Sequence, residues 1–193
     1  MTVTMWLDPV CPFSWNTARW LAAAAQADGF GIEWKQLSLA TLNAGREMPE
    51  HLRQRMADSR TIGRLMAAIR HEAGEKAMVS AYFMFGQRHF DQGLPVGDGL
   101  IDDVLKAAGT TGLTRDAVSG TEFDAEIAAS HQAGQNAYGA EVGSPLLTIN
   151  GQTFFGPVLT EMPPADRAPA SFAAVATLAA LSQFTQLERP RAH

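Results

Sequence analysis

The sequence predicts an α/β protein whose small mixed sheet is interrupted by a long helical segment. Three observations lead to this fold class. A strand–helix–strand pattern lies within residues 3–37, no convincing strand occurs between Pro49 and Gly139, and a strand pair followed by a helix closes the chain. Elements in this order form a sheet with helices on both faces and a helical subdomain inserted midway.

The first unit is a strand, a helix and a second strand. Residues 3–7 are apolar or β-branched and predict a buried strand, which Asp8-Pro9 ends. Residues 13–27 favour a helix that Gly29 stops, and residues 31–37 alternate as a half-buried strand does. A connection of this length and type implies that the two strands run parallel.

The middle of the chain is predicted to be helical throughout. Apolar residues recur at helical spacing in four stretches, and a short capped turn separates the last two. The predicted helices cover 53–73 (ended by Gly74), 76–90, 99–108 and 121–138 (opened by Thr121 as N-cap), and the turn covers 114–117.

The end of the chain returns to β structure. Residues 146–149 and 152–155 predict two strands, and Asn150-Gly151 between them is a strong hairpin signal. A closing helix is predicted over 171–184, and the polar tail 188–193 is predicted to fray. The predicted domains are residues 1–48 with 140–193 for the sheet, and 49–139 for the helical insertion.

Composition narrows the function classes. The chain has 193 residues, 46% of them hydrophobic, a net charge of −5 and a single cysteine. Without clustered Lys or Arg, nucleic acid and anionic membranes are poor partners, and no apolar run is long enough to cross a bilayer. The first residues resemble a strand and not a secretory signal. A lone cysteine favours a free thiol in the reducing cytoplasm, and no metal site is expected.

The stretch Asp-Pro-Val-Cys-Pro-Phe-Ser-Trp at 8–15 places Cys11 at the start of the first helix. Unpaired backbone N–H groups there favour a thiolate, so we expect a lowered pKa for Cys11 in spite of the flanking Asp8. The alternative is a cysteine that only packs as a small hydrophobe. Ser14, one turn along, can donate a hydrogen bond to the sulfur or simply be a solvated residue at the helix start.

A second feature is Gly-Ser-Pro at 143–145, directly before a predicted strand. A proline in this place is compatible with an edge strand that begins there. Because only about 5–6% of X–Pro bonds in folded proteins are cis, position alone predicts a trans bond before Pro145.

Together these features resemble the thioredoxin superfamily, in particular its DsbA-type branch and the actinobacterial mycothiol-dependent reductases, which include a nitroreductase. The resemblance covers nearly the whole chain. The matching segments are DPVCPFSW at 8–15, SLATLN at 38–43, SHQAG at 130–134, VGSP at 142–145 and NGQTFFGPVL at 150–159.

The resemblance implies a thioredoxin fold with a helical insertion and a cis Pro145 beside the sulfur. It implies that Cys11 is the nucleophile and that backbone groups of Ser144 pair with a bound thiol. Ser14 replaces the resolving cysteine, which implies a monothiol reductase that forms a mixed disulfide and then reacts with a small thiol such as mycothiol. Further residues expected around the thiol are Pro12, Phe13, Trp15 and Asn43, and His131 is expected on a helix surface.

Two other functions remain open. Kappa-class glutathione transferases and 2-hydroxychromene-2-carboxylate isomerases have a similar fold and activate a bound thiol with a serine, a role that Ser14 would fill. Alternatively, the chain is a non-catalytic binding module or chaperone in which the Cys11 thiol has an ordinary pKa. Small thiols or disulfides are the expected partners, no cofactor is expected to stay bound, and a homodimer is compatible with the sequence.

Overall fold

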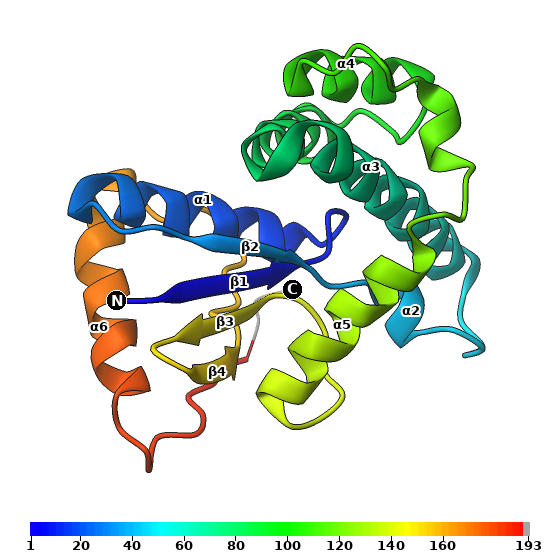
Figure 1. The fold of residues 1–193 in the computed structure, drawn as a ribbon. Helices are drawn as coiled ribbons and strands as arrows, with labels where there is room; N and C mark the ends of the chain where they lie inside the picture. Colours follow the sequence, from blue (N-terminus) through cyan, green and yellow to red (C-terminus); the bar gives the residue numbers. More distant parts are fainter. Residues whose placement is uncertain (191–193) are drawn as a thin grey trace.

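The computed structural model describes residues 1–190. Its sheet has four strands in the order β2-β1-β3-β4, with β2 parallel and β3 antiparallel to β1 (Figure 1). The bounds are β1 Val3–Leu7, β2 Glu33–Gln36, β3 Leu146–Ile149 and β4 Gln152–Phe155. Asn150 and Gly151 adopt positive φ angles of 49° and 86°, as a two-residue hairpin turn requires. The parallel pair and the hairpin confirm the predictions.

Helices α1 (Pro12–Asp28) and α6 (Ala168–Ala179) pack against each other on one face of the sheet. Pro12 occupies the first turn of α1, where its missing N–H costs nothing, and Gly29 ends the helix in the left-handed conformation. The closing helix was predicted over 171–184. It begins earlier, after the 3₁₀ turn η3 (Ala165–Arg167), and ends at Ala179, while Phe184 packs on Phe154 from the segment beyond it.

Helix α5 (Asp124–Tyr138) contacts β2 and β4 and belongs to the opposite side of the sheet. Gly134 allows this approach, because a Cβ there would lie 3.1 Å from the Trp6 ring. Trp6, Leu37 and Leu146 form a small separate core on this side. The predicted N-cap at Thr121 is wrong, since α5 begins at Asp124 with Phe123 as its N-cap.

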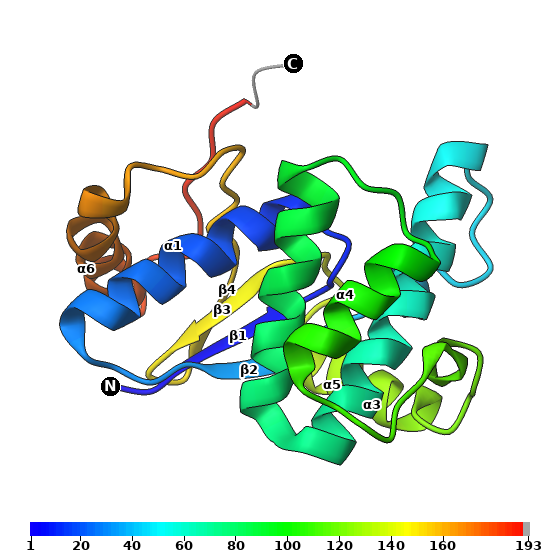
Figure 2. The same cartoon turned by 90° about the horizontal axis from the view of Figure 1, so that it is seen from above.

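The remaining helices form the block beside the sheet (Figures 1 and 2). They are α2 (Leu39–Leu42), α3 (Glu50–Gly86), the π-helical turn η1 (Gln87–Asp91), α4 (Asp98–Ala108) and the 3₁₀ turn η2 (Arg115–Val118). Gly74, with φ 83° and ψ 179°, breaks α3 into two arms, which confirms the predicted stop there. Figure 2 shows the second arm turning back beside α4.

The domain bounds 1–48, 49–139 and 140–193 remain predictions, although α5 is a layer of the sheet and not part of the helical block. The predicted frayed tail lies partly outside the described residues, which end at 190. Within residues 1–190, no helix is long and apolar enough to cross a membrane.

Candidate active site around Cys11

Cys11 lies where the chain passes from the sheet to α1. After β1 ends at Leu7, the Cys11 amide donates to the carbonyl of Asp8 at 3.1 Å, and Cys11 becomes the N-cap of α1. Only 4% of the residue is exposed. The nucleophile predicted from the sequence is therefore a buried thiol at a helix N-terminus.

The loop before β3 meets this cysteine from the other side. The Ser144–Pro145 peptide bond is cis. The resemblance implied this conformation, whereas position alone predicted a trans bond. Register explains the meeting: Trp6 pairs with Leu146, so the same antiparallel ladder continued by two residues sets Ser144 opposite Asp8. The Cys11 Sγ donates to the carbonyl oxygen of Ser144 at 3.3 Å.

Two serine hydroxyls lie beside the sulfur. Ser14 is fully buried and Ser144 nearly so, and their hydroxyls hydrogen-bond each other. The backbone amide of Asp8 donates to the Ser144 Oγ at 2.8 Å. The alternative of a solvated Ser14 is thus wrong, because β1, α1 and the cis-proline loop enclose it.

Asp8 joins three parts of the chain, namely its own loop, the start of α2 and the helix α3, although it is fully buried. Its carboxylate accepts hydrogen bonds from the Val10 amide (2.9 Å), the Leu39 amide (2.7 Å) and the Ser59 hydroxyl (2.6 Å). Burial raises the pKa of Asp8, and these three hydrogen bonds oppose that rise. The acid that the sequence showed only as a neighbour of Cys11 is a structural centre of the site.

The pKa of Cys11 does not follow the prediction. Burial raises the pKa of the thiol above its ordinary value, and the charge of Asp8 adds to the rise. The Ser14 hydroxyl and the backbone amides of Ser14 and Phe13 act in the opposite direction without overcoming burial. The expected helix effect is therefore present but outweighed, because the closed site removes the sulfur from water.

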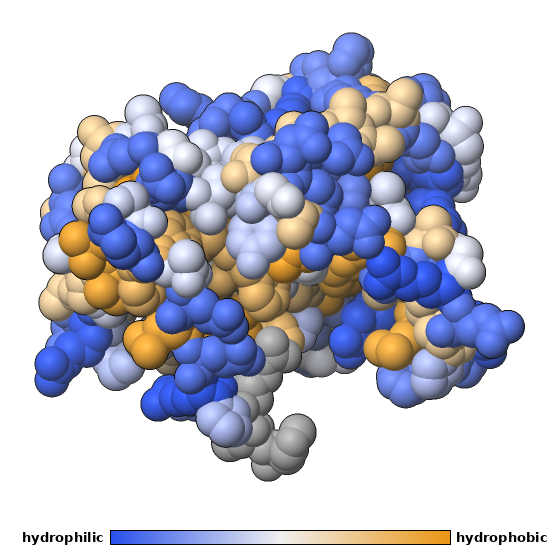
Figure 3. All heavy atoms as spheres, turned by 90° about the horizontal axis from the view of Figure 1, so that it is seen from below, coloured by the Kyte–Doolittle hydropathy of each residue, from blue (hydrophilic) through white to orange (hydrophobic). Residues whose placement is uncertain are grey.

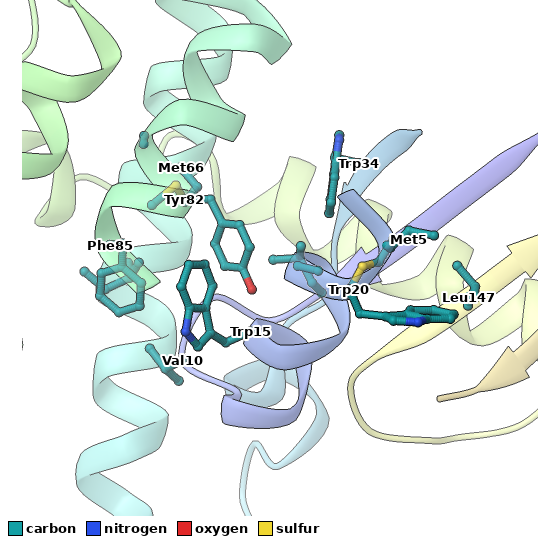
Figure 4. Packing of buried hydrophobic residues seen from close by; sticks show 14 of the residues in the cluster. Met5, Val10, Trp15, Trp20, Trp34, Met66, Tyr82, Phe85 and Leu147 are labelled. Carbon is teal, nitrogen blue, oxygen red and sulfur yellow. The ribbon is translucent and has the colours of Figure 1, made fainter. Parts of the chain in front are cut away.

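Trp15 packs against the helical block. Figure 4 shows its ring beside Tyr82 of α3, and the two ring centroids are 5.9 Å apart. Its Nε1 donates to Asp91 at 3.0 Å, and the Arg19 guanidinium lies over the ring. Gly86 of α3 makes room for it, since a Cβ there would lie 2.3 Å from the ring. Trp15 thus fastens α1 to the helical block.

The other expected residues occupy the rim of the site or lie apart from it. Pro12 and Phe13 are half-buried in the first turn of α1. Asn43 ends α2 and donates to the Leu39 carbonyl at 2.9 Å, so its observed role is to cap that short helix. His131 is buried and not on a helix surface as expected, and its Nδ1 accepts from the Ser38 amide at 3.4 Å.

Sequence reasoning missed Ser59 and Tyr82, both on α3. Tyr82 is fully buried, and its hydroxyl has no hydrogen-bond partner among the described residues. Burial raises its pKa well above the ordinary value, with smaller contributions from the charges of Cys11 and Asp8. A polar residue within the apolar stripe of a predicted helix, as Ser59 is between Met56 and Ile62, was the available signal.

Two hollows flank the site. A cavity of about 40 Å³, which is room for about three water molecules, lies between the ends of β1 and β2, α3 and α5, and Pro9, Trp34, Met66 and Tyr82 are part of its lining. An open groove of about 500 Å³ runs between α1 and the second arm of α3, past Trp15, Arg19 and Phe83. Among residues 1–190, no group of His, Cys, Asp and Glu has the arrangement of a metal site.

The chain is similar to several known proteins. The chain is 28% identical over 195 residues to the uncharacterized protein Rv2286c of Mycobacterium tuberculosis, which covers 98% of this chain and 82% of that protein. The cytosolic disulfide reductase DsbM from Pseudomonas aeruginosa with GSH is similar in structure, with a TM-score of 0.62, 18% identity and coverage of 91% of this chain and 98% of that one.

A 2-hydroxychromene-2-carboxylate isomerase is similar to the same degree, with a TM-score of 0.61, 18% identity and coverage of 92% and 96%. At these identities, the likeness to the two solved structures establishes the shared fold alone. The profile of the family described as Rv2466c-like, mycothiol-dependent nitroreductase Rv2466c, matches residues 10–189. The buried thiol of Cys11 and the cis-proline loop thus belong to a member of the Rv2466c-like family of mycothiol-dependent reductases.

Proposed function

We propose that this protein is a monothiol oxidoreductase that works through a mixed disulfide on Cys11, with a low-molecular-weight thiol such as mycothiol as co-substrate. One observation carries the proposal: the sulfur of Cys11, the single cysteine of the chain, donates to the carbonyl of Ser144, directly before cis Pro145. A strand-like partner that pairs with the backbone of Ser144 places its own sulfur at Cys11. The family described as mycothiol-dependent supports the choice of co-substrate.

The proposed reaction exchanges sulfur bonds in two steps. The Cys11 thiolate attacks a disulfide, a bond forms between Cys11 Sγ and one sulfur, and the other sulfur leaves as a thiolate with the electron pair. A second small thiolate then attacks the mixed disulfide, releases a new disulfide and restores the Cys11 thiolate. Because Ser14 has no sulfur, the resolving thiol comes from solution.

Burial of Cys11 gives the resting protein a protonated, protected thiol. Substrate entry has to displace the Ser144 carbonyl from the sulfur, after which the Ser14 hydroxyl and the first amides of α1 stabilise the thiolate. We place the protein in a reducing compartment, where a lone thiol stays free.

The transferase or isomerase alternative gives Ser14 the central role. The structure provides an argument against it: Ser14 is fully buried, and the sulfur beside its hydroxyl is that of Cys11. A serine that activates a separate thiol needs room beside its hydroxyl for that thiol. The non-catalytic alternative is compatible with the raised pKa of Cys11, and it predicts that no mixed disulfide forms.

The test is to incubate the protein with mycothiol disulfide, and separately with glutathione disulfide, and to measure the intact mass. We expect one added thiol on the wild type, none on Cys11→Ser, and release of the adduct by free mycothiol. Ser14→Cys is the informative partner variant, because its new thiol should resolve the adduct intramolecularly and shorten its lifetime. Absence of any adduct on the wild type at alkaline pH would refute the proposed function.

A further inference from the structure

The two serine hydroxyls beside Cys11 form a chain whose direction can be worked out. A hydroxyl has one proton to donate and lone pairs that accept. The amide of Asp8 has only a proton, so at the contact of 2.8 Å the Ser144 Oγ must be the acceptor. The Ser144 proton is then left for its remaining hydroxyl partner, which is Ser14.

A hydrogen bond in the opposite direction, from Ser14 to Ser144, would have a higher free-energy cost in a buried site. If Ser14 donated to Ser144, the Ser144 Oγ would accept twice, and its own proton would have no acceptor among the hydrogen bonds of residues 1–190. A buried donor without a partner costs about 1–3 kcal/mol. If Ser144 donates to Ser14 instead, the Ser14 proton has an acceptor in the neighbouring Cys11 sulfur, with which the Ser14 hydroxyl interacts. Only this direction therefore gives both hydroxyl protons an acceptor.

We propose that Ser144 is a positioning residue: its hydroxyl, fixed by the Asp8 amide, donates to Ser14 and so turns the Ser14 proton toward the Cys11 sulfur. This inference rests on the proposed role of Cys11 as the nucleophile. Ser144 then serves both forms of the sulfur. Its carbonyl accepts the proton of the thiol, and its hydroxyl, acting through Ser14, supplies a donor to the thiolate.

The charged and titratable groups around the sulfur make this donor necessary. Asp8, at the end of β1, raises the cost of a second negative charge, and Tyr82 from α3 is the other titratable group within electrostatic range. Arg19 of α1 acts on Tyr82 and lowers the pKa of its hydroxyl. In the enclosed site, the thiolate therefore depends on the Ser14 hydroxyl and the first amides of α1 for stabilisation.

The experiment is the pH dependence of Cys11 alkylation by iodoacetamide in four proteins: the wild type, Ser14→Ala, Ser144→Ala and the double variant. We expect each single substitution to move the midpoint to higher pH, and Ser144→Ala to add nothing once Ser14 is gone. A midpoint one pH unit higher makes alkylation at neutral pH about tenfold slower. An unchanged midpoint in Ser144→Ala would overturn the inference. So would a double variant whose midpoint shift equals the sum of the shifts in the two single variants.

Two further variants separate positioning from folding. Ser144→Thr keeps the hydroxyl and should keep the wild-type midpoint, so a shift in a folded Ser144→Thr protein also counts against the inference. Ser59→Ala is the matched control, because it removes another buried hydroxyl bonded to Asp8 and should not raise the midpoint. Alkylation needs no disulfide substrate, so the two experiments are independent. The mass experiment can refute the proposed function while the hydrogen-bond chain from Ser144 through Ser14 to Cys11 is confirmed, and the alkylation experiment can refute this chain while a mixed disulfide still forms.

Discussion

Asp8 and Asp102 show how differently the two halves of this molecule use the same residue type. Asp8 is fully buried, accepts hydrogen bonds from its own loop and from two other segments, and has a raised pKa. Asp102 lies on the surface of α4, pairs with Arg115, and has its pKa lowered mainly by the hydrogen bond from that guanidinium. Burial dominates in the first case and pairing in the second.

The difference indicates in which region a substitution of a polar residue should lower the stability of the protein most. Around Cys11, polar groups are out of water, so each lost partner leaves an unsatisfied group at full cost. On the helical block, ion pairs such as Arg115 with Asp98 and Asp102 remain hydrated, so water replaces a lost partner. We therefore expect the same kind of substitution to have large effects in the first region and small effects in the second.

The largest expected effect is at Gly86, where α3 of the helical block meets Trp15 of α1. Gly86→Ala would place a Cβ within 2.6 Å of three atoms of the ring, so one of the two helices must shift. We expect a loss of about 1–3 kcal/mol in the free energy of unfolding, measured by denaturant titration.

Gly99→Ala is the control, because nothing lies within 4 Å of a Cβ at that helical position. It should leave stability unchanged or raise it by up to about 1 kcal/mol. Equal stability of the two variants would show that the contact between Gly86 and Trp15 is not tight.

The next effect concerns Ser59, the α3 side chain that donates to Asp8. Ser59→Ala removes one of the three donors to a buried carboxylate, so we expect about 1–3 kcal/mol lower stability. Ser80→Ala, on the second arm, removes an exposed hydroxyl that only bonds the preceding turn and serves as the control. A loss at Ser80 as large as that at Ser59 would contradict the contrast between buried and exposed groups.

The pH dependence of stability tests Asp8 itself. Because its folded pKa is raised, its contribution to stability is present below its ordinary value of 3.8 and is lost as pH rises through the folded pKa. Asp8→Asn lacks this titration. The unfolding free energy of the wild type minus that of Asp8→Asn should therefore fall as pH rises above 3.8. A difference that grows with pH would mean that the folded protein lowers the pKa of Asp8.

The smallest effect is expected at Arg115, which pairs with Asp98 and Asp102 on the exposed side of the block. Arg115→Ala should change the unfolding midpoint too little to resolve at physiological salt, because water and ions screen such pairs. Repeating the melt at low and high salt is the check. A large, salt-independent loss would show that this network is as important as the buried cluster.

Local pattern was sufficient for most of the backbone. The parallel unit at 3–37, the Asn150-Gly151 hairpin and the break at Gly74 depend on residues adjacent in sequence, and each appears where it was predicted. The predicted start of α5 is wrong: threonine is a favourable residue at an N-cap, but the helix begins three residues after Thr121, at Asp124. Helix α2 was missed, since four residues are too few for a periodic signal.

The sequence by itself determined the order of the elements, the position of Cys11 at a helix start and the replacement of a second sulfur by Ser14. The tertiary structure decided the state of the thiol. Ser144, Pro145 and the helical block enclose Cys11. Burial there raises the pKa of the thiol, and the hydrogen bonds at the N-terminus of α1 oppose that rise. The reason is that hydrogen-bonding capacity is a property of each residue, whereas exclusion of water depends on segments more than a hundred residues apart.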